Sequence, residues 1–296
     1  MGNHKNKVLI LTDSTADLPQ HLIEERNVLV IPQIIHLGDQ ELRDGVDIKT
    51  DEMYDWVKDN NQLPSSAAPS PYAFQELLQP YIDDGYDVFY SGIGTGLSGT
   101  GRNYLLAAQE FPENRLYFLD SGNLSSGIAI IILKACDLRD QGYSAKEIHE
   151  KLSDLPPRVH SQFVLRTLEF MRKGGRASGM QALLGAAFQI KPVLRVRSGK
   201  LFLYKNAMGK ISRGMDIQLD DFFKEYDQGN IVEDYMFITH TENPKMYEYA
   251  KEKILARGVK MKHIYEGQAG CVISTHCGPG TIGILYEVKE YNEEEK

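Results

Sequence analysis

The sequence predicts an α/β protein with two domains, the first of which has a parallel sheet between layers of helices. Its 296 residues are too many for one comfortable hydrophobic core and suit two. Over residues 1–160, strand-like runs alternate with helix-like runs, which is the order that builds parallel β-α-β units. Hairpin-like runs follow "LPPRVH", so residues 161–296 are expected to form a second α+β domain with a mixed sheet.

Apolar runs and their periodicity place the elements of the first half. The run "KVLILTD" is a buried strand, and residues 49–60 form a helix with Trp56 on its apolar face. Residues 63–71 are a loop by composition, and Pro80 should kink or divide its helix. We expect strands at 7–13, 28–38, 86–93 and 115–120, and helices at 14–26, 49–60, 72–85, 100–111 and 127–142.

The second half reads differently. Residues 191–205 predict a hairpin turning at Ser198-Gly199, and residues 269–288 predict two strands joined across Gly278-Pro279-Gly280. The run "MQALLGAAFQI" at 180–190 is an apolar helix, and the helix at 166–175 is closed by glycine. Further strands are expected at 161–165, 235–240 and 259–267, with a helix between the last two.

The composition excludes several classes of protein. The formal charge of −8 gives no general attraction to nucleic acid or to anionic membranes. The three cysteines form no CxxC pair, and Cys271, His276 and Cys277 lack a fourth ligand at a zinc-like spacing. There is no signal-peptide core and no run of roughly 18 apolar residues. We therefore expect a cytoplasmic protein without a bound metal.

A glycine-rich loop within "YSGIGTGLSGTGRNY", residues 90–104, is one candidate site. The spacing Gly94-x-Gly96-x-x-Gly99 and the later Asp120 match the dinucleotide-binding fingerprint of a Rossmann-type oxidoreductase. A complete β-α unit precedes it, however, and a pyrophosphate cradle works through backbone N–H groups rather than side chains. The loop also carries hydroxyls, at Ser91, Thr95, Ser98 and Thr100. These could equally cap the next helix or bind a carboxylate, so three interpretations stay open.

Polar residues elsewhere also suit an anion site. Asp13 ends the first strand, where ligands of open α/β sheets collect, although Ser14 with Asp17 approximates a capping box. Arg176 follows a Gly-Gly helix end and is either a solvated arginine or a fork for carboxylate or phosphate. His276 lies at the end of a predicted strand and is either structural or a donor to a carboxylate.

A hydrolase that uses Ser98 and His276 is a weaker alternative. The G-x-S-x-G elbow of α/β hydrolases would need glycine at residue 100, and this chain has Thr100. No residue set forms a convincing catalytic constellation, and no G-x-x-x-x-G-K-[ST] loop is present to hold ATP. We expect neither catalytic residues nor a cofactor.

Taken in order, these motifs resemble those of the DegV family, the fatty-acid-binding proteins of mainly Gram-positive bacteria. The matching segments are "TDSTADLP", "YSGIGTGLSGTGRNY", "LDSGNLSSG", "FVLRTLEFMRKGGRASG", "QIKPVL" and "HCGPGTIGILY". The resemblance implies an α/β/α domain at 1–160, a second α/β domain at 161–296, and one long-chain fatty acid between them. It also implies a non-catalytic role. A separate ATP-dependent kinase subunit phosphorylates the carboxylate of the bound acid, and the acyl phosphate enters phospholipid synthesis.

The resemblance assigns the head-group contacts residue by residue. Ser66 in "SSAAPS" stands where the family's "TSQPS" has its contacting threonine, and Thr95 in "GTGLSGT" stands at the contacting serine of "SSGLSGT". Ser98 and His276 are retained, as is Arg176 of the "GGR" motif, which the family places near the head group. The chain departs from the family at Met208, about where an arginine is common.

A bound fatty acid makes two opposite demands on these residues. Each buried methylene contributes about 0.8 kcal/mol, so a sixteen-carbon tail offers on the order of 10 kcal/mol before ordering costs. Such a tail needs a dry channel, and the helix at 180–190 is a credible wall. An unpaired buried carboxylate would take up a proton and lose its charge. Hydrogen bonds from the hydroxyl and imidazole donors would keep it ionised. The expected partners are the fatty acid and the kinase subunit, with only transient membrane contact and a monomeric state.

Overall fold

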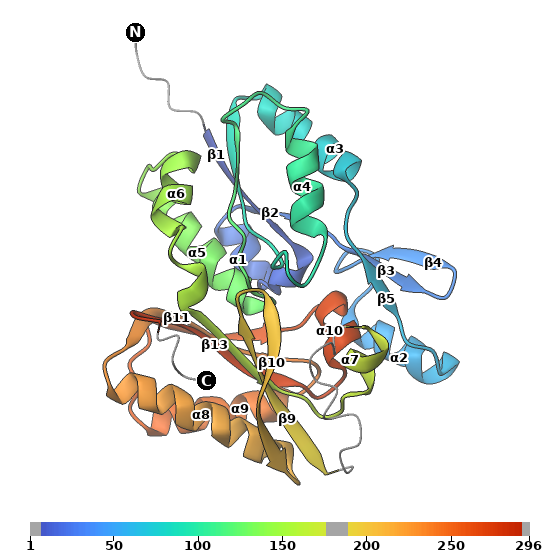
Figure 1. Cartoon of the computed structure of the whole chain (residues 1–296), viewed down its shortest axis with the longest axis vertical. Helices are drawn as coiled ribbons and strands as arrows, with labels where there is room; N and C mark the ends of the chain where they lie inside the picture. The colour runs from blue at the N-terminus through green and yellow to red at the C-terminus, as the bar shows by residue number, and fades with distance from the viewer. Residues whose placement is uncertain (1–6, 176–188, 292–296) are drawn as a thin grey trace.

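The computed structural model describes residues 7–175 and 189–291. Its first half contains a parallel four-stranded sheet in the order β2-β1-β6-β7 (Figure 1). Side chains alternate between its two faces, because Ile10 and Phe89 join one hydrophobic cluster while Leu11 and Tyr90 join another. The strands are β1 (Lys7–Asp13), β2 (Val28–Ile31), β6 (Tyr86–Tyr90) and β7 (Leu116–Phe118).

Helices cover both faces of this sheet. On one face lie α1 (Gln20–Glu25), α5 (Ser126–Asp140) and α6 (Ala145–Leu152), and on the other lie α3 (Pro71–Asp83) and α4 (Thr100–Ala108). The predicted α/β/α arrangement is confirmed. Helix α6 was not predicted, although Ser144 and Glu147 form a capping box at its start.

The second half builds a mixed six-stranded sheet in the order β10-β9-β8-β13-β11-β12. Only the pair β11–β12 is parallel among its described pairings. Helices α8 (Ile211–Asp227) and α9 (Pro244–Ala256) pack on one face. The strands are β8 (Val159–Val164), β9 (Ile190–Arg197), β10 (Lys200–Met208), β11 (Ile231–His240), β12 (His263–Gln268) and β13 (Ile282–Val288). The mixed sheet is confirmed, whereas the domain boundary at residue 160 stays a prediction.

Helix α5 lies between the two sheets (Figure 1). Its first part, residues 127–133, is apolar on all sides, which is typical of a helix segment that is buried all round. It packs against β1 of the first sheet and against β8, β11 and β13 of the six-stranded sheet, and its cluster includes Tyr235, Phe237 and Leu285. One hydrophobic cluster therefore spans both halves of the chain.

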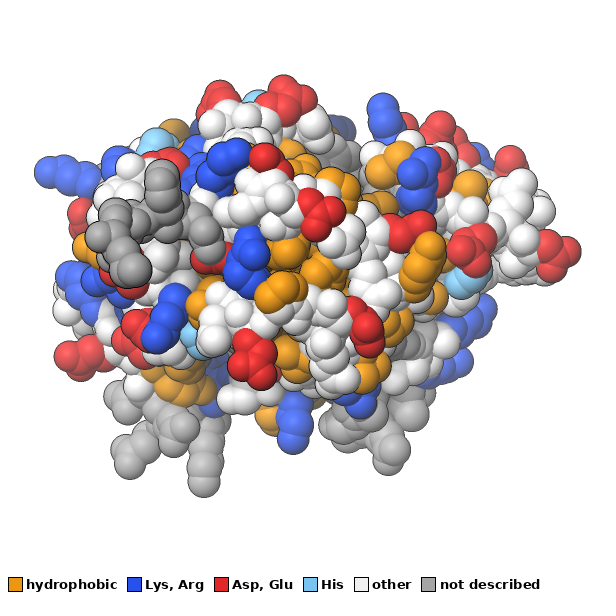
Figure 2. Space-filling model, turned by 90° about the horizontal axis from the view of Figure 1, so that it is seen from above, with side chains coloured by type: hydrophobic (Ala, Val, Ile, Leu, Met, Phe, Trp, Pro, Cys, Tyr) orange, Lys and Arg blue, Asp and Glu red, His pale blue; other side chains and the backbone are white. Residues whose placement is uncertain are grey.

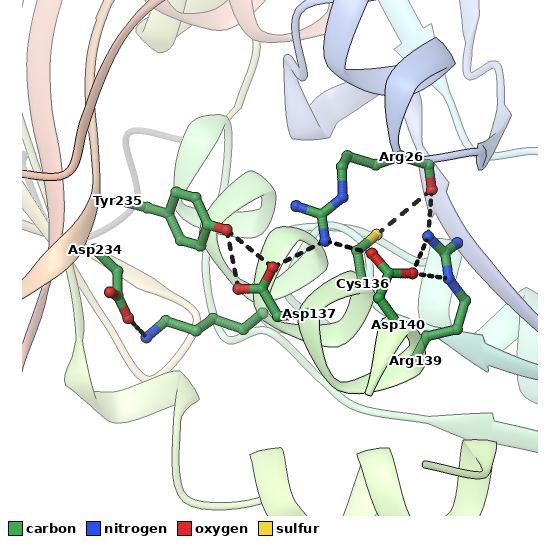
Figure 3. A network of polar contacts seen from close by, with 8 residues as sticks. Arg26, Cys136, Asp137, Arg139, Asp140, Asp234 and Tyr235 are labelled. Carbon is green, nitrogen blue, oxygen red and sulfur yellow. Dashed lines mark hydrogen bonds and ion pairs between the residues drawn. The ribbon is translucent and has the colours of Figure 1, made fainter. Parts of the chain in front are cut away.

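Polar contacts hold the outer end of α5 to both halves (Figure 3). Asp137 accepts hydrogen bonds from Nη2 of Arg26 at 2.8 Å and from the hydroxyl of Tyr235 at 2.9 Å. Nearby, Nζ of Lys134 lies 2.7 Å from a carboxylate oxygen of Asp234 on β11. This network ties the end of α1, helix α5 and strand β11 together.

A small antiparallel sheet, in the order β4-β3-β5, corrects two predictions. The expected strand at 28–38 is two strands in different sheets, because Pro32 has no N–H group to continue a ladder. The expected loop at 63–71 contains β5, which pairs with β3. The strands are β3 (Ile34–Leu37), β4 (Gln40–Arg43) and β5 (Ser65–Ala67).

Helix α2 (Thr50–Asn60) packs beside this small sheet. Trp56 lies on the apolar face of the helix, as predicted, and packs against the hydrophobic cluster between the helix and the sheet. Helix α3 is not divided at Pro80, which lies in the last turn, where it removes only one helical hydrogen bond. The helix expected at 14–26 is instead a 3-10 turn, η1 (Ser14–Ala16), followed by α1 after Pro19.

The predictions for the second half had mixed outcomes. The hairpin turn at Ser198-Gly199 is confirmed, with positive φ angles of 47° and 69°. Helix α7 (Glu169–Lys173) ends at Gly174 as expected, and the helix predicted at 180–190 lies outside the described residues except for its last two. The segment 269–288 is not two strands, because its first part is helix α10 (Cys271–Cys277). A further 3-10 turn, η2 (Pro156–Arg158), leads into β8.

The surface shows charges of both signs. In Figure 2, Lys and Arg side chains are interspersed with Asp and Glu around a group of hydrophobic side chains near the centre of the face. No helix in residues 7–175 and 189–291 combines the length and apolar character that a membrane crossing requires.

Candidate functional site

A cavity of about 130 Å³ lies between the two halves of the chain. Its polar lining residues are Gln33, Ser66, Ser98 and His276. The remaining wall is formed by small and apolar residues, Ala67, Ala68, Ile93, Leu97, Gly99, Leu124, Met171, Leu201, Val272, Ile273 and Cys277. The first half of the chain supplies three of the polar groups, and the second half supplies the imidazole.

His276 and Ser66 are in direct contact across the cavity lining. Nε2 of His276 lies 3.0 Å from Oγ of Ser66, which β5 places beside β3. On its other side the ring lies against Gly174, where an added Cβ atom would overlap Nδ1. Gly174 is therefore needed as glycine so that the end of α7 can support the imidazole.

The position of His276 corrects a sequence prediction. We expected the end of a strand, because "CVIST" is rich in β-branched residues, but the histidine lies in the last turn of α10. This short helix is almost wholly buried, and buried packing outweighs the weak local preference of its residues. The helical form directs the imidazole toward β5.

Ser98 joins the site through a chain of hydrogen bonds. Its Oγ lies 2.9 Å from Oγ1 of Thr100, which in turn accepts a hydrogen bond from Nε2 of Gln33 at 3.0 Å. Gln33 precedes Ile34, which pairs with Ala67 next to Ser66, so these groups gather at one side of the cavity. Sequence reasoning missed Gln33. The available signal was a polar residue directly after a strand and a proline, at the sheet edge where ligands collect.

Two acids, the buried Asp13 and the half-buried Asp120, hold the glycine-rich loop. Oδ2 of Asp13 accepts hydrogen bonds from the backbone N–H of Ile93 and from the hydroxyl of Tyr90, each at 3.0 Å. Asp120 accepts the N–H of Thr95 at 3.1 Å and also its hydroxyl. The hydroxyl of Thr95 is thus engaged by Asp120, and Thr95 is not among the described residues that line the cavity.

The glycines of the loop serve contacts between backbones. A Cβ atom at Gly94 would lie 2.9 Å from the backbone nitrogen of Asn123, and one at Gly96 would overlap the carbonyl oxygen of Gly199. Protein backbone therefore fills the space in front of two glycines where a dinucleotide site would hold its pyrophosphate. This disfavours the Rossmann-type alternative. The hydrolase alternative also loses support, because the hydroxyl in contact with His276 is that of Ser66.

A second hollow of about 30 Å³ adjoins the cavity. The two share Leu124, Ile273 and Cys277 as lining residues, so these side chains form the partition between them. Burial raises the pKa of the Cys277 thiol to about 12, which keeps it protonated and apolar. Within the described part of the chain, no three His, Cys, Asp or Glu side chains group as metal ligands.

A wider cleft of about 800 Å³ lies beside η1 and α1. Its lining includes the acids Asp13, Asp17, Asp44 and Glu266, and no described lysine or arginine. Such a lining offers, among the residues that the structure describes, no lysine or arginine to pair with a carboxylate. The smaller cavity, with its hydroxyls and imidazole, is the better anion site. Arg176, the remaining predicted head-group residue, lies outside the described residues.

Comparisons with known proteins identify the family of the chain. Residues 7–289 match the family model described as "Uncharacterised protein, DegV family". The chain belongs to the DegV family. A DegV domain-containing protein of Clostridium perfringens is 30% identical over 97% of this chain and 100% of its own length.

Two solved structures share the fold over nearly the whole chain. A fatty-acid-binding DegV family protein from Thermus thermophilus is 29% identical, with a TM-score of 0.87 over 95% of this chain and 99% of its own. A stearic-acid-binding protein from Eubacterium ventriosum is 22% identical, with a TM-score of 0.83 over 95% of this chain and 98% of its own. At 22% identity, the comparison with the Eubacterium ventriosum protein shows only that the fold is shared.

Proposed function

We propose that this DegV protein binds one long-chain fatty acid between its two halves and presents the carboxylate to a separate ATP-dependent kinase subunit. The observation that carries the proposal is the contact between His276 and Ser66, 3.0 Å apart on the lining of an apolar-walled cavity. The fatty-acid-binding relative from Thermus thermophilus, which has the same fold, adds support.

The head group would take the place of the contact between these two residues. The Ser66 hydroxyl and the His276 imidazole each offer a hydrogen-bond donor, and Ser98 supplies a second hydroxyl on the same side. Charge-assisted hydrogen bonds of this kind are stronger than neutral ones. We assign Thr95 to shaping the loop through Asp120, and we retain Arg176 as a proposed neighbour of the head group.

The tail would follow the apolar wall of the cavity. Leu97, Leu124, Met171 and Ile273 line that wall, and the smaller hollow beyond the partition offers a direction for further carbons. Burying a sixteen-carbon chain provides on the order of 10 kcal/mol before ordering costs, enough for stable retention.

The kinase subunit would supply the phosphoryl-transfer machinery. This sequence has no G-x-x-x-x-G-K-[ST] loop, so ATP would bind to the partner while the acid stays in the DegV protein. The acyl phosphate would then enter phospholipid synthesis. A monomer in the cytoplasm, meeting the membrane only transiently, fits this role.

Mass spectrometry of organic extracts from the purified protein tests the binding step. C14–C18 acids should co-purify, and delipidated protein should take up added palmitate. A ligand-free preparation that binds no added acid would contradict the proposal. Adding an ATP-dependent fatty acid kinase subunit to the loaded protein tests presentation, with acyl phosphate trapped by hydroxylamine as the expected product. A titration with NAD(H) should give no binding signal.

A further inference from the structure

Helix α10 belongs to the second half of the sequence but is held by the first half. The hydroxyl of Thr50 donates to the carbonyl oxygen of Ala269 at 2.9 Å, and that of Tyr54 donates to the carbonyl oxygen of Ser274 at 3.2 Å. The helix carries His276 in its last turn, so whatever fixes α10 also fixes the imidazole against Ser66.

Asp44 binds the start of this helix with both carboxylate oxygens. Oδ1 accepts the backbone N–H of Cys271 at 2.8 Å, and Oδ2 accepts that of Val272 at 3.4 Å. Oδ2 also accepts the hydroxyl of Ser14 at 2.8 Å. The Asp44 side chain is buried, so these contacts are shielded from water.

Asp17 holds the residue just before the helix. Its Oδ1 accepts the N–H of Gly270 at 2.8 Å, and its Oδ2 accepts the hydroxyl of Ser125. Ser125 has a φ of 53° and a ψ of −146°, a backbone conformation that persists only where surrounding contacts impose it. Ser125 follows Leu124, which lines the cavity, so Asp17 connects the start of α10 to the cavity wall.

A helix this short depends on such contacts. Its first N–H groups have no partners within the helix, and an isolated peptide of this length is not helical in water. Carboxyl oxygens at this end accept hydrogen bonds from those N–H groups, whose carriers are Cys271, Val272 and the preceding Gly270. Cys271 and His276 are five residues apart, or about 7.5 Å along the axis, so a change at the capped end shifts the imidazole.

We propose that Asp44 and Asp17 are positioning residues for the head-group site, because they fix the start of α10 and thereby the approach of His276 to Ser66. This inference rests on the proposed function, since it explains how the two halves of the chain form one carboxylate site. Neither acid is among the described residues that line the cavity. Their effect reaches the ligand through the imidazole.

Asp44→Ala in the full chain tests the proposal, with affinity measured for palmitate and for hexadecanol, which lacks the charge. The ratio of the two affinities should fall by about tenfold, because the loss of a helix cap displaces the residue that reads the carboxylate. Asp44→Asn keeps an oxygen for the N–H of Cys271 and should restore most of the ratio.

Asp137→Ala is the matched control. Asp137 also bridges the two halves, through Arg26 and Tyr235, but lies in the separate network of Figure 3. Its loss should lower stability and leave the ratio unchanged. A folded Asp44→Ala protein with an unchanged ratio, or an equal fall in Asp137→Ala, would overturn the proposal.

A second measurement needs no ligand. In ¹⁵N-histidine NMR spectra, the Nε2 signal of His276 should move in Asp44→Ala toward its position in Ser66→Ala, where the contact is absent. An unmoved signal would refute the positioning role. If Asp44→Ala does not fold, Gly270→Ala replaces it, because a Cβ there would lie 3.2 Å from Asp44 and 3.3 Å from Asp17. If the unaltered protein binds neither lipid, the proposed function fails, and the NMR result still decides the positioning claim.

Discussion

The backbone of Gly96 lies so close to Gly199 that a Cβ atom at residue 96 would overlap the carbonyl oxygen of Gly199. The N–H of Gly199 also donates to the carbonyl oxygen of Gly122 at 2.8 Å. The glycine-rich loop of the first half therefore meets the β9–β10 turn of the second half through a close contact between backbones. The contact lies beside Leu97 and Ser98, which line the cavity.

Gly96→Ala should lower the free energy of unfolding by about 1–3 kcal/mol, since a methyl group is forced against backbone that cannot rotate away. Gly99→Ala is the matched control, because a Cβ there meets only the flexible end of Arg102, at 3.8 Å. Urea denaturation of both variants checks this. Equal losses would show that the loop does not depend on the contact with Gly199.

His276→Ala should weaken the binding of palmitate more than that of hexadecanol. Hydrogen bonds to a charged group contribute about 1.5–3 kcal/mol, and the alcohol presents no charge for the imidazole to bind. Isothermal titration of delipidated protein with both lipids gives the comparison. Matching losses for the two lipids would mean that the histidine does not distinguish charge.

Ser98 should contribute to ligand binding, whereas Thr95 should contribute to stability. Thr95→Val leaves the Asp120 carboxylate without its hydroxyl partner, so the melting temperature should fall while palmitate affinity changes little. Ser98→Ala removes a hydroxyl from the cavity lining and should weaken palmitate binding by about 1 kcal/mol. The assignment of Thr95 to the loop would be wrong if Thr95→Val weakened binding as much as Ser98→Ala does.

Stability should depend on pH through Asp17. Burial raises the pKa of its carboxyl group well above the ordinary value of 3.8. The folded state therefore binds this proton more tightly than the unfolded state, so the contribution of Asp17 to stability is greatest below pH 3.8. That contribution is lost as the pH rises through the folded-state pKa. Asp17→Asn cannot ionise and should flatten this fall in denaturation experiments between about pH 4 and 7. A slope identical to that of the unaltered protein would contradict the prediction.

Ile273→Ala should shift the preference toward longer acids, because Ile273 is part of the partition between the cavity and the smaller hollow. Ile254→Ala is the control, since Ile254 is fully buried beneath the six-stranded sheet, in another hydrophobic cluster. Both changes should cost about 2–5 kcal/mol of stability. Only Ile273→Ala should alter the ratio of C18 to C14 affinity in competition assays. An unchanged ratio would show that Ile273 does not separate the cavity from the smaller hollow.

The sequence predicted those parts of the fold where local pattern and tertiary environment agree. The strand "KVLILTD", the turn at Ser198-Gly199 and helix α2 all have side-chain periodicity or turn residues that match their final surroundings. Helix α10 could not be found in this way. Its β-branched residues favour a strand, and its helical form depends on Asp44 and Asp17, which are distant in sequence.

The candidate site shows the same limit. Ser66, Ser98 and His276 were identified by motif, and the structure brings all three to one cavity. Gln33 follows a strand and a proline, but that local signal does not reveal the pairing of Ile34 with Ala67 that brings it beside Ser66. The glycines of residues 94–99 matched a nucleotide fingerprint because close approach of backbone and close approach of phosphate call for the same residue.

The insertion of α10 among Thr50, Tyr54 and Asp44 means that the lobes interlock. Each half supplies part of the polar lining of the cavity, since one contributes Ser66 and Ser98 and the other contributes His276. Cleavage of the chain near residue 160 should therefore yield fragments that each expose apolar surface. The proposed lipid binding should return only when the two fragments reassemble.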